Sequence, residues 1–74
     1  MSKNPLYQNE IATAHKFIIE HNTDPELQKF LHNIKNREDL LHSDRWSLCY
    51  DFLAKHYPAA TGTIVTGLAY WLED

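Results

Sequence analysis

Three residues whose side chains could bind a metal or act in catalysis are spaced by seven along the chain: His42, Cys49 and His56. On a helix this spacing places successive members on one face but about 10 Å apart, because each residue advances the helix by about 1.5 Å. Zinc ligands lie about 2.0–2.3 Å from the ion, so these three side chains cannot share one. We therefore predict that Cys49 is a buried, unreactive thiol and that no metal is bound.

The other residue patterns on which enzymes depend are absent from the sequence. Nucleophilic catalysis needs a base within hydrogen-bond reach, and the cysteine lies two helical turns from either histidine. The acidic pairs Glu38–Asp39 and Glu73–Asp74 are sequence neighbours whose side chains point apart, and there is no glycine-rich phosphate loop. A chain of 74 residues also leaves little room for a ligand cavity. We predict a non-enzymatic protein with no cofactor, metal or small-molecule substrate.

Length and composition predict one folded domain over residues 1–74. The sequence is 43% hydrophobic, which is too apolar for a disordered chain. The single cysteine excludes an intrachain disulfide, as is common in reducing compartments. The N-terminal residues are polar, and no stretch approaches the roughly 20 apolar residues of a membrane span. We expect a cytoplasmic protein that does not enter a membrane.

Two pairs of a polar residue and proline predict where the first two helices begin. Asn4 precedes Pro5 and Asp24 precedes Pro25, and such pairs satisfy the free N–H groups of a first helical turn. Apolar residues recur at helical spacing after each pair. The predicted fold is all-α, a small bundle of four main helices and one short helical turn, with helical residues 5–21, 25–35, 37–42 (the short turn), 44–57 and 59–72.

Helix 44–57 is predicted to be the centre of the fold because it is apolar on two sides. A helix that is hydrophobic on two sides is covered on two sides. One side is a stripe of Trp46, Cys49, Tyr50, Leu53 and Tyr57, and the other carries Leu48 and Phe52.

The stretch from Tyr57 to Leu72 carries no charged side chain. Its two glycines disfavour a helix by up to about 1 kcal/mol each, but a lone strand would leave its backbone groups unpaired. We therefore predict a helix over 59–72. One side of it suits a core, and the other side is small and neutral with an aromatic residue near its end.

The neutral side of this predicted helix favours protein binding, because depleted charge together with Tyr and Trp is typical of interface cores. The acidic C-terminus lies at the negative end of the helix dipole, where a basic partner would be favourable. Packing of this side against helix 5–21 is the alternative. We predict a small adaptor or inhibitor that binds a protein partner or self-associates as a homodimer. The predicted contacts are Gly62, Thr63, Thr66, Tyr70, Trp71, Glu73 and Asp74.

A second hypothesis is a DNA-binding regulator or nucleic-acid accessory protein, since the break at Tyr57–Pro58 has the outline of a helix-turn-helix. The helix that would enter the groove has no Arg, Lys, Asn or Gln to read bases or contact phosphates. The net charge of −3 also disfavours nucleic acid. Under this hypothesis the contacts would be Lys29, Lys35, Arg37 and Arg45.

Overall fold

The computed structural model describes residues 5–73, and this part of the chain is helical without strands. The predicted all-α class and its four main helices are confirmed. The elements are the 3-10 turn η1 (Pro5–Tyr7), α1 (Gln8–Glu20), α2 (Pro25–Lys35), α3 (His42–His56), the 3-10 turn η2 (Pro58–Ala60) and α4 (Val65–Glu73).

The start of α2 follows from local capping. The carboxylate of Asp24 accepts hydrogen bonds from the backbone N–H groups of Glu26 and Leu27, at 3.0 and 3.3 Å. Proline at the first helical position has no N–H that needs a partner. The same signal at Asn4 lies outside the described residues, and there the chain forms η1 before α1 begins.

Of the short helical turn predicted at 37–42, residues 37–41 are not helical. The chain instead makes a tight turn in which the N–H of Leu40 donates to the carbonyl of Arg37 at 3.4 Å. Helix α3 then begins at His42, and the carboxylate of Asp44 in its first turn accepts from the N–H of Leu41 at 3.3 Å.

The helix predicted over 59–72 starts later than expected. Residues 58–60 form η2, residues 61–64 form turns, and α4 begins at Val65. The weak helix preference of Gly62 and the neighbouring threonines accounts for this delay.

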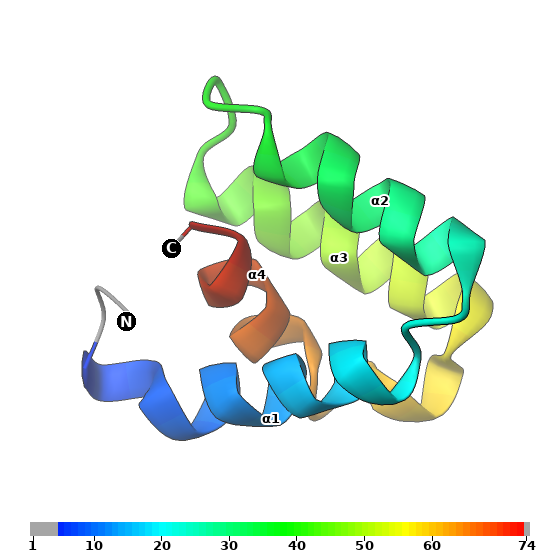
Figure 1. Ribbon diagram of the computed structural model, residues 1–74. Coiled ribbons are helices and arrows are strands. Elements are labelled where there is room, and N and C mark those ends of the chain that lie inside the picture. Colours follow the sequence, from blue (N-terminus) through cyan, green and yellow to red (C-terminus); the bar gives the residue numbers. More distant parts are fainter. Residues whose placement is uncertain (1–4, 74) are drawn as a thin grey trace.

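The central element is α4, whereas the sequence analysis predicted the third helix. In Figure 1, α4 lies between α1 on one side and the α2–α3 pair on the other. Five of its nine residues are buried: Val65, Gly67, Leu68, Ala69 and Leu72. The small residues Gly67 and Ala69 suit this position because neighbouring helices can approach the backbone closely there.

Helix α4 packs closely against α1 at Gly67. A methyl group built on Gly67 would lie 2.0 Å from the carbonyl oxygen of Glu10 and 3.2 Å from the Cβ of Ala14. Only glycine therefore allows α1 to lie at this distance.

Candidate docking surface

The residues predicted to bind a partner separate into two groups in the structure. Gly62 and Thr63 are exposed in the turn before α4, and Thr66 is half-buried in the first turn of that helix. Tyr70, Trp71 and Glu73 lie near the other end of α4, and Asp74 lies outside the described residues.

The second group makes contacts within its own chain. The ring of Tyr70 stacks on both Tyr7 and His42, with ring centroids 4.2 Å apart in each case. The Nδ1–H of His42 donates to the carboxylate of Glu73 at 2.6 Å. The ammonium of Lys35 lies 4.2 Å from the centre of the Trp71 ring. The donor to Glu73 is therefore His42 of the same chain, whereas the sequence suggests a basic partner.

Thr66, of the first group, contacts an aromatic residue of α3. The indole N–H of Trp46 donates to the hydroxyl of Thr66 at 3.2 Å. Trp46 also stacks on Tyr50, with ring centroids 5.5 Å apart. The two residues are 37% and 44% exposed, so they do not belong to the core stripe to which the sequence analysis assigned them. Only Cys49 and Leu53 of that stripe are buried.

We call the area around this aromatic pair the neutral surface. On α3, its residues recur at helical spacing along the flank that faces away from α2. The residues that this surface takes from the turns before α4 and from the first turn of α4 are small. It comprises Ser43, Trp46, Ser47, Tyr50, Ala54, Ala59, Gly62, Thr63 and Thr66, all exposed except the half-buried Thr66, and none charged.

An apolar hollow of about 420 Å³ adjoins the neutral surface at Ala59 and Thr63. Its other lining residues are Phe17, Tyr57, Pro58, Ala60 and Ile64.

One wall of this hollow is held by a polar contact, in which the hydroxyl of Tyr57 donates to the carboxylate of Asp24. This hydrogen bond, together with burial, raises the pKa of Tyr57 to about 12. The same hydrogen bond lowers the pKa of Asp24, helped by the two backbone N–H groups that it caps.

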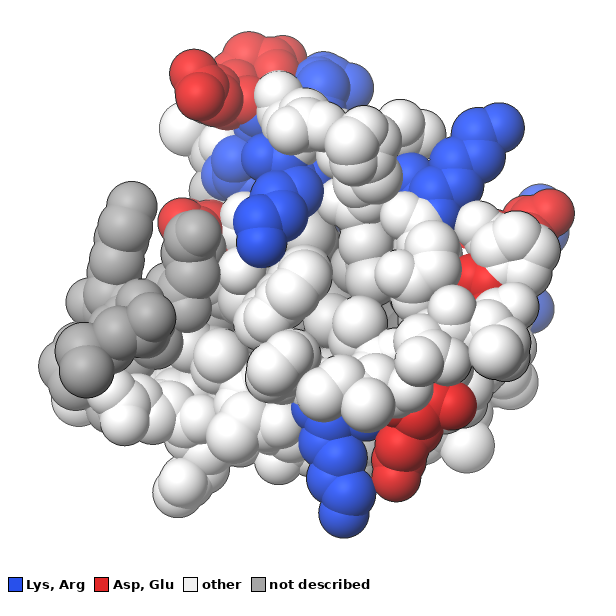
Figure 2. Space-filling model, in the orientation of Figure 1, with Lys and Arg blue, Asp and Glu red and all other residues white. Residues whose placement is uncertain are grey.

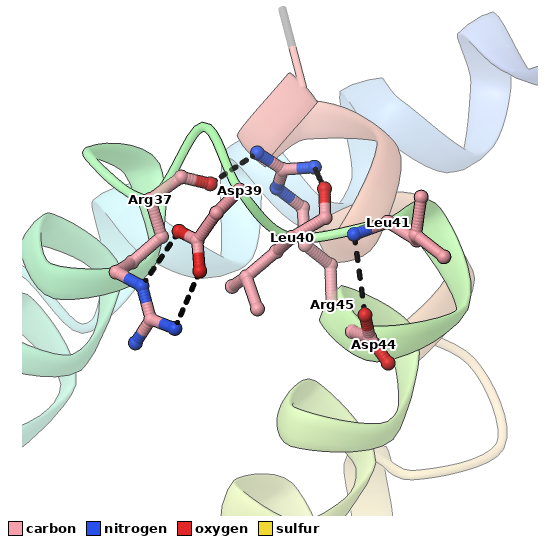
Figure 3. Close-up of polar contacts among 6 residues, drawn as sticks. All are labelled: Arg37, Asp39, Leu40, Leu41, Asp44 and Arg45. Carbon is pink, nitrogen blue, oxygen red and sulfur yellow. Dashed lines mark hydrogen bonds and ion pairs between the residues drawn. The ribbon is translucent and has the colours of Figure 1, made fainter.

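Two of the four basic residues of the DNA-binding hypothesis already have partners within the chain. Arg37 forms a two-pronged ion pair with Asp39, at 2.9 and 3.0 Å. Arg45 is 9% exposed, and its two Nη atoms donate to the carbonyls of Leu40 and Arg37 at 2.7 and 2.8 Å (Figure 3). On the face seen in Figure 2, basic side chains stand apart from one another with acidic ones among them.

Cys49 is fully buried as predicted, and burial raises the pKa of its thiol to about 12. His42 and His56 stand at the two ends of α3. Within residues 5–73 there is no group of three or more His, Cys, Asp or Glu side chains that could hold a metal ion. None of the helices described is long and apolar enough to cross a membrane.

Comparisons of the chain with protein-family models, with curated proteins and with solved structures found no match. Sequence reasoning found Gly62, Thr63 and Thr66 through their missing charge but missed Trp46 and Tyr50. The signal that could have found these two is the uncharged run of residues at helical spacing from Ser43 to Ala54.

Proposed function

We propose that this protein is a non-enzymatic protein-binding module, an adaptor or inhibitor, that docks its partner on the neutral surface. The observation that supports this most is the exposed Trp46–Tyr50 pair, surrounded by small uncharged side chains. Aromatic residues in a charge-depleted surround are typical of the energetic centre of protein interfaces. The hydrogen bond to Thr66 holds the indole in place before binding, which lowers the entropic cost of association.

The chemistry of the surface selects the kind of partner. A charged side chain buried against it would find no opposite charge, and unpaired burial of charge is costly. The partner therefore presents an uncharged, largely apolar face. One apolar side chain of that face fills the hollow beside Ala59 and Thr63, which is lined mainly by carbon.

The DNA-binding alternative has no comparable support. The helix that would have to enter a groove is α4, and among the described helices it has the largest share of buried residues. Of the four proposed phosphate contacts, Arg45 is buried and Arg37 is already paired with a carboxylate.

The test is affinity capture with matched variants. Thr63→Arg places a charge on the neutral surface, and Gln8→Arg places the same charge at an exposed position of α1. We expect Thr63→Arg to abolish capture of the partner and Gln8→Arg to preserve it. Equal capture by both variants, with both shown to be folded by circular dichroism, would refute the assignment of the surface.

A photo-crosslinking amino acid at Tyr50 identifies the partner's own segment. We expect mass spectrometry to find adducts on an uncharged apolar stretch of one protein, and no such adduct when the crosslinker replaces Gln8 on α1. Adducts that map to a lysine- or arginine-rich stretch would contradict the proposed chemistry.

A further inference from the structure

A groove runs between α2 and α3, on the flank of α3 opposite the neutral surface. Its floor is a run of stacked rings, in which Phe30 lies 4.4 Å from Phe52, and Phe52 lies 4.3 Å from His56, between ring centroids. Leu48 of α3, 36% exposed, extends this apolar floor. The cavity measures about 570 Å³ and is open to solvent. We call it the α2–α3 groove.

Two acidic and two basic residues line the rims of the groove. Glu26 and Lys29 stand on α2, and Asp51 and Lys55 stand on α3. All four are exposed. The ion pairs in the described part of the chain are Arg37–Asp39 and His42–Glu73, so none of the four rim charges is paired. The groove thus combines an uncovered aromatic floor with four charges that have no partner.

The order of these charges along the groove is regular. Helices α2 and α3 run in opposite directions (Figure 1). The Phe30–Phe52 stack marks the point at which the two helices are level, that is, at the same position along their common direction. At about 1.5 Å per residue, Glu26 lies about 6 Å from this stack and Lys55 about 4.5 Å from it, both toward the start of α2.

The second pair follows the same arithmetic. Lys29 lies about 1.5 Å from the level of the stack on one side and Asp51 about 1.5 Å on the other. Each acidic residue on one rim is therefore nearly level with a basic residue on the other rim.

We infer that the α2–α3 groove binds a second copy of this chain. The two copies are related by a two-fold axis that runs parallel to α2 and α3. This rotation places α2 of one copy on α3 of the other, and each residue keeps its position along the helix axis. Glu26 then faces Lys55 of the second copy, and Lys29 faces Asp51 of the second copy. Phe30 packs on Phe52 of the second copy between these ion pairs, and the symmetry repeats every contact.

The self-complementary charge order is what selects a second copy over an unrelated helix. A two-fold interface requires each residue to meet its complement on an identical surface. Both rims satisfy that requirement, because each carries one acid and one base and the antiparallel helices reverse their order. Dimerisation would also bury the phenylalanine floor, and a chain this short gains much from added apolar burial.

The test is the molar mass in solution, measured by sedimentation equilibrium over a range of protein concentrations. We expect the protein to reach twice its chain mass of 8.7 kDa. In the dimer, Lys55→Glu places an acidic side chain opposite Glu26 of the other copy, and the symmetry creates this repulsion at two places. We expect it to raise the dissociation constant by about tenfold or more. Glu26→Lys should do the same. The double variant Glu26→Lys/Lys55→Glu restores the opposite charges and should restore the dimer.

Matched controls separate the groove from the rest of the molecule. Lys16→Glu makes the same charge change on the exposed side of α1, and we expect it to leave the dissociation constant unchanged. Thermal melts followed by circular dichroism show whether each variant is folded. A protein that stays at 8.7 kDa at the highest concentrations, or a dimer that single reversals do not weaken, would overturn the inference. So would a monomer whose groove captures a different protein.

This inference does not depend on the proposed function. Thr63→Arg, which should abolish partner capture, lies outside the groove and should leave the mass of the dimer unchanged. Lys55→Glu should leave crosslinking from Tyr50 intact. Failure of one proposal is therefore distinguishable from failure of the other.

Discussion

The indole N–H of Trp46 donates to the hydroxyl of Thr66, and this hydrogen bond joins α3 to the first turn of α4 at the surface of the protein. Trp46 is 37% exposed, and this hydrogen bond sets the orientation of its ring. The contact links the fold to the candidate site, because it orients the largest side chain of the neutral surface.

A double-mutant cycle on this pair measures the contact. Trp46→Phe removes the N–H donor, and Thr66→Val removes the acceptor while keeping the shape of the side chain. We expect a coupling free energy of about 0.5–1 kcal/mol, since net hydrogen bonds are worth about 0.5–1.5 kcal/mol and this one is partly exposed. Urea denaturation of the four proteins gives the value. Strictly additive effects of the two changes would show that the hydrogen bond contributes nothing in solution.

The two glycines should respond oppositely to alanine. A methyl group at Gly67 would overlap the carbonyl of Glu10, so α1 and α4 must move apart. We expect Gly67→Ala to lower the free energy of unfolding by about 2–3 kcal/mol, as overpacking of a core does. At Gly62 nothing lies within 4 Å, and its backbone angle φ is not positive.

Gly62→Ala is therefore the matched control for Gly67→Ala. We expect it to be neutral or to stabilise by up to about 1 kcal/mol, because alanine restricts the unfolded chain. Chemical denaturation of both variants tests the pair. Equal losses of stability would contradict the close packing of α1 on α4.

Acid should weaken the protein partly through Asp24. The hydroxyl of Tyr57 and two backbone N–H groups lower the pKa of this carboxyl below its ordinary 3.8. A carboxyl whose pKa is lower in the folded state stabilises the fold above the unfolded pKa, and this contribution is lost as the pH falls through the folded value. Tyr57→Phe should therefore make the stability fall less steeply with decreasing pH below 3.8.

The measurement is the melting temperature as a function of pH for the wild type and Tyr57→Phe. The basic side offers an internal check. The pKa of Tyr57 is raised to about 12 in the folded protein, so the stability from this hydroxyl is complete below its ordinary pKa of 10.0 and is lost between the two values. Tyr50→Phe serves as the control, since that hydroxyl makes no contact with Asp24. Identical acid slopes for the wild type and Tyr57→Phe would refute the assignment.

The sequence predicts the elements whose signals are local and misses those that depend on packing. The predicted helix 25–35 agrees with α2 at both ends. Its start is specified locally, by the Asp24 cap and by Pro25 at the first helical position. The start of α4 was placed six residues too early, at 59 instead of Val65. Nothing local distinguishes the turns around Gly62 from a weak helix, and the enclosure by α1 and α3 that stabilises α4 is a tertiary effect.

The same distinction explains the candidate site. Periodicity reports which residues are apolar, and it does not report which of them are covered. Trp46 and Tyr50 fit the apolar stripe of α3, but they lie at its edge, where an aromatic residue with a polar tip can face solvent. The α2–α3 groove could not be predicted at all, because its charge order depends on the levels at which Phe30 and Phe52 meet.

Arg45 is the buried charged residue of the described part of the chain. Its guanidinium donates to the carbonyls of Leu40 and Arg37 and so holds the turn between α2 and α3 (Figure 3). Its Nε atom has no hydrogen-bond partner. Because the two carbonyls need donors in a fork, lysine cannot replace arginine here.

We expect Arg45→Lys to lower the free energy of unfolding by about 1–2 kcal/mol and Arg45→Ala by about 2–4 kcal/mol, since unpaired buried acceptors and a cavity both remain in the second case. Hydrogen exchange should show faster exchange of the Leu40 amide, which donates within this turn. Lys16→Ala, which removes an exposed basic side chain on α1, is the control. If Arg45→Lys leaves both stability and exchange unchanged, the turn is held by other contacts, and the buried guanidinium has no structural role.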